Sequence, residues 1–281
     1  MIRQKTIKNS VFVEGAGLQT GAKTKVVFKP AAPDSGIVFI RTDLPKNPTV
    51  KLQDFVFGAG SINERRTTIG NAELQIQTVE HMLSALSALA VANIVIEIDG
   101  LELPGLDGSA WGYFEALKKA GIVEQDYPQK VIRVVDPILC EGKNGSLLAA
   151  FPSEVLRISY TLDYRSSGIG TQYIDIVVNE NSFEKELAPA RTFCMEEEAM
   201  ALIKIGLGKG ANYDNTLVMN EKGPVKNKLR FQNEPVRHKV TDLIGDMYVT
   251  GMPVSAHIIA AKSGHSLNME LVKKLKESVS G

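Results

Sequence analysis

Cysteine is scarce in this sequence. The two cysteines, Cys140 and Cys194, lie far apart in the chain and form no Cys-x-x-Cys pair. A disulfide-stapled fold and a zinc site built from thiolates are therefore excluded, and so low a cysteine content is typical of a reducing compartment.

The sequence also lacks an excess of either charge and a long hydrophobic run. Basic and acidic residues number 32 each, so no overall field attracts nucleic acid or an anionic membrane. The apolar run near the N-terminus is too short for a signal peptide. The longest apolar stretch, residues 85–96, is interrupted by Ser87 and Asn93 and cannot span a membrane. We expect a cytoplasmic monomer with no nucleic-acid partner and no stable membrane insertion.

What is present is an alternation of strand and helix patterns. β-Branched and aromatic runs bounded by Gly, Pro or Asp predict strands, and apolar residues at helical spacing predict a helix over residues 78–90, with Thr78 as its N-cap. The first half then continues with a strand, a loop and a helix closed by Gly121. Early strands are expected at residues 9–15, 24–30 and 36–43, and a later one at 92–100.

The second half repeats this order of strands, helix, strand, loop and helix. The repetition predicts an α+β fold of two topologically similar βα domains that arose by internal duplication. We place the domains at residues 1–126 and 127–281, joined near residues 124–130. The second domain carries an extra hydrophobic insertion near residues 195–225, in which we expect a short helix, a glycine-rich turn and a strand.

Histidine is also scarce, and three of its four positions are candidates for chemistry. His238 and Asp242 are spaced four residues apart on a predicted helix, so they share one face. Such a pair can bind a divalent metal, and His81, at the matching helix start of the first half, is the natural third ligand. The alternative is that His238 and Asp242 form an ordinary surface ion pair. His257 alternates with apolar neighbours in a strand and is interpreted as structural.

Three further residues could accompany a metal. Glu80 precedes His81 and points about 100° away from it on a helix, which suits a general base; the alternative is a glutamate favoured in the first helical turn. His265, in the predicted loop KSGHSLN, could be a general acid. Asp246 lies one turn beyond Asp242 and could orient a catalytic histidine, or it could be a solvated charge.

Several unusual motifs occur in one order along the whole chain. They are SVFVEGAGLQTG, TVEHMLSAL, NIVIEIDGLELPGLDGSA, ARTF, LRFQNEPVRHKVTDLIGD and KSGHSLN. Together they make the sequence similar to the zinc-dependent UDP-3-O-acyl-N-acetylglucosamine deacetylases of lipid A (lipopolysaccharide) biosynthesis in Gram-negative bacteria. The resemblance implies two βα domains with the active site at their interface, and an insertion that forms a passage for an acyl chain.

The resemblance also assigns roles to residues. It implies zinc ligands at His81, His238 and Asp242, although this donor set also suits Fe²⁺. It implies a catalytic base at Glu80 and a second catalytic group at His265 that is oriented by Asp246. An oxyanion-stabilising hydroxyl is implied at Thr192, and substrate contacts at Phe193, Lys239 and Lys262.

The implied reaction is removal of the N-acetyl group from an acylated UDP-N-acetylglucosamine, which gives acetate and a free amine. Two other interpretations stay open at this point. The same metal site could serve a deacetylase of another sugar or small amide. Alternatively, the repeated halves could form a nucleotide- or protein-binding scaffold whose histidines are incidental.

Overall fold

The computed structural model describes residues 2–52, 66–70, 74–165 and 167–280. It contains both helices and sheets, which confirms the α+β class. Within these residues, no helix is both long and apolar enough to cross a membrane.

The first half forms a five-stranded sheet in the order β2-β3-β8-β4-β5. Its alternating burial, as in β4, is the signature of a sheet with one face on a core. Among the described strands of this sheet, the β4–β8 pair alone is parallel. The strands are β2 (Val11–Ala16), β3 (Lys23–Pro30), β4 (Ile37–Arg41), β5 (Thr49–Lys51) and β8 (Ile94–Ile98).

The second half forms another five-stranded sheet, in the order β11-β12-β19-β13-β14. Its one parallel pair within the described residues is β13–β19. In chain order, its strands therefore take the same places and directions as those of the first sheet. They are β11 (Ile138–Glu141), β12 (Leu147–Phe151), β13 (Arg157–Tyr164), β14 (Gly170–Val177) and β19 (His257–Ala261).

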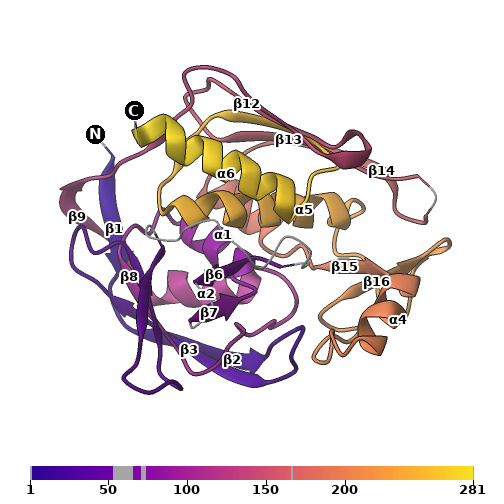
Figure 1. The fold of residues 1–281 in the computed structure, drawn as a ribbon, viewed down its shortest axis with the longest axis horizontal. Helices are drawn as coiled ribbons and strands as arrows, with labels where there is room; N and C mark the ends of the chain where they lie inside the picture. The colour runs from indigo at the N-terminus through magenta and orange to yellow at the C-terminus, as the bar shows by residue number, and fades with distance from the viewer. Residues whose placement is uncertain (1, 53–65, 71–73, 166, 281) are drawn as a thin grey trace.

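Helices from both halves lie between the two sheets (Figure 1). They are α1 (Glu80–Ala88) and α2 (Trp111–Ala120) from the first half, and α5 (Glu234–Met247) and α6 (His265–Ser280) from the second. Helices α1 and α5 pack directly on each other at the centre. A Cβ at Gly245 would lie 2.0 Å from the carbonyl oxygen of Glu80, so glycine is required for this approach. The close crossing places residues of the two halves side by side.

The insertion of the second half lies to one side of these layers (Figure 1). It contains the short helix α4 (Glu196–Lys204) and a three-stranded sheet in the order β15-β16-β17. The helix and the strand β16 (Leu217–Asn220) correspond to the elements predicted for this region. The other two strands are β15 (Phe193–Met195) and β17 (Gly223–Pro224).

The remaining elements are short. They are the strands β1 (Arg3–Ile7), β6 (Thr68–Gly70), β7 (Gln75–Gln77), β9 (Ile122–Pro128), β10 (Ile132–Arg133) and β18 (Val254–Ser255), the helix α3 (Glu180–Ser182), and the 3-10 or π segments η2 (Lys143–Gly145), η3 (Phe183–Leu187) and η4 (Tyr248–Thr250).

Two local predictions were wrong. Thr78 is not an N-cap: it has a φ of 58°, and its hydroxyl donates to Glu102 Oε1 at 2.9 Å, while α1 begins after Val79. His265 does not lie in a loop but is the first residue of α6, because buried Leu267 extends the helix's apolar face by one turn. The joining segment at residues 124–130 is largely strand, since β9 pairs antiparallel with β1.

Candidate metal centre and active site

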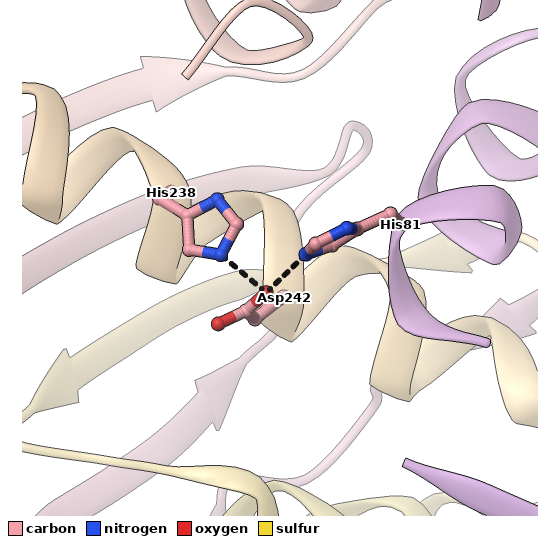
Figure 2. Close-up of side chains that lie close together, drawn as sticks. All are labelled: His81, His238 and Asp242. Atoms are coloured by element: carbon pink, nitrogen blue, oxygen red, sulfur yellow. Dashed lines mark ion pairs between the residues drawn. The ribbon is translucent and has the colours of Figure 1, made fainter. Parts of the chain in front are cut away.

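Three buried side chains converge where α1 crosses α5 (Figure 2). His81 Nε2 lies 3.6 Å from Asp242 Oδ1, and His238 Nε2 lies 3.2 Å from the same oxygen. One ligand atom from each residue lies within 4.8 Å of the other two. The surface ion-pair interpretation of His238 and Asp242 is therefore wrong, because both side chains are almost completely buried.

Hydrogen bonding fixes the protonation of His238. Its Nδ1 lies 3.0 Å from the carbonyl oxygen of Ala190. A carbonyl can only accept, so Nδ1 carries the hydrogen and the lone pair of the neutral ring is on Nε2. Burial favours this neutral form and lowers the pKa of His238 to about 3. His238 is thus held as a neutral imidazole whose free nitrogen faces the carboxylate, as a metal ligand requires.

The carboxylate of Asp242 is held in its charged form. Burial opposes ionisation, but the Lys239 ammonium and the hydrogen bond from His81 outweigh it and keep the pKa of Asp242 well below its usual range. Lys239 Nζ donates to Asp242 Oδ2 at 2.9 Å. Two imidazole nitrogens and one carboxylate oxygen form a donor set that fits zinc and leaves a coordination position open for chemistry.

Glu80 lies beside this cluster without belonging to it. The glutamate is buried, and its Oε2 accepts a hydrogen bond from the backbone N–H of Thr67 at 3.0 Å. Burial raises the pKa of Glu80 above its usual value. A carboxylate of raised basicity next to a metal ligand can accept a proton from a water.

A second cluster surrounds the fully buried Asp246. His265 Nδ1 lies 2.8 Å from Asp246 Oδ2, and Asn268 Nδ2 donates to that oxygen at 2.8 Å. The Thr67 hydroxyl donates to the other oxygen, Oδ1. Burial alone would lower the pKa of His265, but the attraction of Asp246 outweighs it and raises this pKa to about 9. His265 is therefore positively charged at neutral pH and directs its other nitrogen away from Asp246.

A buried ion pair places Thr192 and Phe193. The preceding residue, Arg191, donates through its backbone N–H and its Nε to Glu234 Oε1, both at 3.0 Å. Glu234 is the first residue of α5, so the ARTF segment is fixed to the helix that carries His238 and Asp242. The Phe193 ring lies 6.5 Å from the His238 ring, centre to centre.

One cavity of about 950 Å³ is lined by many of the side chains described above, namely Glu80, His81, Thr192, Phe193, His238, Asp242 and His265. A cavity of this size suits a substrate with both a polar head and an apolar tail. Its polar end contains all three members of the metal cluster together with Glu80, Thr192 and His265, and its apolar wall includes residues of the insertion. The apolar lining includes Leu18, Ala199, Met200, Leu202, Ile203 and Val218.

The two lysines expected to bind substrate occupy different places. Lys239 lines the main cavity, where its Nζ lies 5.8 Å from the centre of the Phe193 ring. Lys262 lines a smaller hollow of about 260 Å³, which shares Lys239 and Tyr164 with the main cavity. The hollow therefore adjoins the main cavity and adds positive charge beside it.

Thr67 and Asn268 also belong to this site, although the sequence did not predict them as site residues. Asn268 follows His265 by three residues on α6, so a helix predicted to start at His265 would have placed both on one face. Thr67 offered no such signal, because it precedes a short strand and reaches the site through the tertiary structure.

Comparison with known proteins gives matches over nearly the full chain. The family model described as UDP-3-O-acyl N-acetylglycosamine deacetylase matches residues 4–277. A protein of Bdellovibrio bacteriovorus named UDP-3-O-acyl-N-acetylglucosamine deacetylase is 40% identical over 280 residues, which is 99% of this chain and 91% of the relative. Proteins of the same name from Chlamydia pneumoniae (40% over 280 residues; 98% of each chain) and Thermodesulfovibrio yellowstonii (38% over 276 residues; 98% and 92%) are also similar. These matches include both sheets, the insertion and the whole cavity.

Proposed function

Because the chain belongs to the UDP-3-O-acyl-N-acetylglycosamine deacetylase family, it is a deacetylase of lipid A biosynthesis, and we propose that it works as a zinc-dependent amidohydrolase. Its substrate is UDP-3-O-(3-hydroxyacyl)-N-acetylglucosamine, and its products are acetate and the free amine. The observation that carries this proposal is the single cavity that holds a His81–His238–Asp242 cluster, a buried glutamate and a charged histidine.

The metal cluster supplies the electrophilic part of the chemistry. His81, His238 and Asp242 would hold zinc, and Fe²⁺ suits the same donors. The bound ion would polarise the amide carbonyl and lower the pKa of a water to about 7. Support for this proposal comes from the fit of the donor set, in which the Ala190 carbonyl directs the His238 lone pair into the cluster.

The protein's own side chains carry the proton transfers. Glu80 accepts a proton as water oxygen bonds to the acetamide carbon. The Thr192 hydroxyl donates a hydrogen bond to the oxyanion that develops. His265, oriented by Asp246 and charged before the reaction, donates its proton to the sugar nitrogen as the carbon–nitrogen bond breaks, since an amide nitrogen is a poor leaving group without a proton.

The remaining residues bind the substrate. Lys239 and Lys262 place positive charge at the end of the cavity that receives the anionic nucleotide, and Phe193 offers an apolar surface beside the cluster. Residues 195–210 of the insertion form the passage for the acyl chain, which is supported by the position of Met200 and Ile203 in the cavity wall.

We also propose that the two halves, residues 1–126 and 127–281, are duplicated domains with the active site at their interface. The identical strand order of the two large sheets supports duplication. The position of the cluster, with His81 on α1 and its partners on α5, supports an interfacial site. We place the protein in the cytoplasm as a monomer, because one chain supplies the whole cluster and both cysteines are free.

Acetate release from an acylated and an unacylated UDP-N-acetylglucosamine tests the substrate assignment. We expect kcat/KM to be at least about 100-fold higher for the acylated substrate, because burial of each methylene is worth about 0.8 kcal/mol and a long chain has many. Equal turnover of the two substrates would instead favour a general sugar deacetylase. Absence of acetate release from both, together with absence of bound metal, would favour a binding scaffold.

A further inference from the structure

Thr67 connects the two proton-transfer groups of the site. Its backbone N–H donates to Glu80 Oε2 at 3.0 Å. Its hydroxyl donates to Asp246 Oδ1 and lies 3.2 Å from His265 Nδ1. Glu80 lies on α1, and Asp246 and His265 lie on α5 and α6, so a single buried residue contacts groups from three helices.

Both carboxylate oxygens of Asp246 accept hydrogen bonds from neighbouring donors. Oδ2 accepts from His265 and Asn268, and Oδ1 accepts from Thr67. Because Asp246 can only accept when it is ionised, the Thr67 hydroxyl proton is committed to Oδ1. The His265 Nδ1–H is likewise committed to Oδ2, which leaves Nε2 as the nitrogen that carries the transferable proton. Thr67 thus orients the Asp246 carboxylate, which in turn orients the His265 imidazole.

We propose that Thr67 is a positioning residue that holds the general base Glu80 and the general acid His265 in one geometry. Its amide restrains Glu80, and its hydroxyl restrains the Asp246–His265 pair. This inference rests on the proposed function, because it assigns Thr67 to the proton transfers of amide hydrolysis. Groups that orient a reacting residue typically contribute 10–100-fold when they are removed.

The neighbouring residue provides a matched control. Within the described part of the chain, the buried Thr68 hydroxyl has no hydrogen-bond partner. Thr68→Val therefore makes the same chemical change one position away without removing a contact. Thr67→Val removes the hydroxyl but keeps the backbone N–H that holds Glu80, whereas Thr67→Ser keeps both groups.

Steady-state acetate release by the zinc-loaded protein and its variants tests the inference. We expect Thr67→Val to lower kcat by about 10–100-fold with KM and zinc content unchanged, and Thr67→Ser and Thr68→Val to stay within about threefold of the wild type. An equal loss of kcat in Thr67→Val and Thr67→Ser would overturn the inference. So would a Thr67→Val variant that loses thermal stability but keeps the wild-type kcat.

A double-mutant cycle separates positioning from a general structural effect. In a His265→Ala background the Thr67→Val substitution should cost less than about twofold, since its effect acts through His265. The same cost in both backgrounds would contradict the inference. The wild-type protein in the same assay separates a failure of the proposed function from a failure of the Thr67 inference. A wild type that releases no acetate would refute the proposed function itself.

Discussion

Glu80→Ala is expected to lower kcat by roughly 10²–10⁴-fold while the protein keeps one zinc ion per chain. The reason is that Glu80 accepts a proton but offers no ligand atom to the cluster, whose members are His81, His238 and Asp242. The backbone N–H of Thr67 would lose its acceptor, which water can replace in the space left by the side chain. Metal analysis and acetate release on the same sample measure both quantities.

Two comparisons make the Glu80 result specific. Glu80→Gln keeps the size of the side chain and an oxygen for the Thr67 N–H, but it cannot accept a proton, so its kcat should be as low as that of Glu80→Ala. Asp242→Ala should lose zinc as well as activity, because it removes a ligand. Loss of zinc from Glu80→Ala would show that Glu80 is a ligand and that its assignment as the base is wrong.

His265→Ala should lower kcat by a similar factor, about 10²–10⁴-fold, and should remove the basic limb of the pH–rate profile. His265 must be protonated to donate, and Asp246 raises its pKa to about 9 in spite of burial. Wild-type activity should therefore fall as the pH rises through about 9. In His265→Ala no group with this pKa remains at that position, so the profile should stay level there.

His257→Ala is the control for the His265 experiment, because His257 lies on β19 next to Ser159 rather than in the cavity. Its pH–rate profile should match that of the wild type. A profile of His265→Ala that keeps the wild-type basic limb would count against His265 as the acid.

The raised pKa of His265 also makes the stability of the folded protein depend on pH. The folded-state pKa of His265 lies above its unfolded value of about 6.5. The charged form is therefore favoured by folding, and its contribution is complete below pH 6.5 and is lost as the pH rises through about 9.

The sequence indicated that the side chains of His81, His238 and Asp242 could come together, because two of them obey helix geometry, and the family resemblance implied their role as ligands. His238 and Asp242 are four residues apart on α5, and the repeated order of elements indicated His81 on the equivalent helix. What spacing could not decide was whether these residues were exposed. Burial depends on the crossing of α1 and α5, which is made close by Gly245, and no local pattern encodes such a crossing.

The Asp246 environment was harder to predict for a related reason. Asp246 and His265 were recognised, but two of the three groups that donate to the carboxylate were not. Thr67 is 179 residues from Asp246 in sequence, and a lone threonine before a short strand has no pattern that distinguishes it. The predicted loop at KSGHSLN also hid the helical relation of His265 and Asn268.

Strand and helix predictions succeeded where one face of the element is buried. The strands β4 and β8 are rich in β-branched and aromatic residues, which predicted them, and every second residue of each is buried against the core. The exposed β9, in contrast, has polar residues and a proline, so it was interpreted as a joining segment. Its pairing with β1 depends on a strand more than a hundred residues away, which propensity cannot detect.

The metal dependence of acetate release is the most direct test of whether the protein is a zinc-dependent deacetylase. The purified protein is assayed on the acylated UDP-N-acetylglucosamine, then after removal of metal by a chelator, and again after addition of one equivalent of zinc. We predict that activity is lost with the metal and returns with zinc in the wild type, and that it does not return in Asp242→Ala. Full activity in metal-free protein would contradict it.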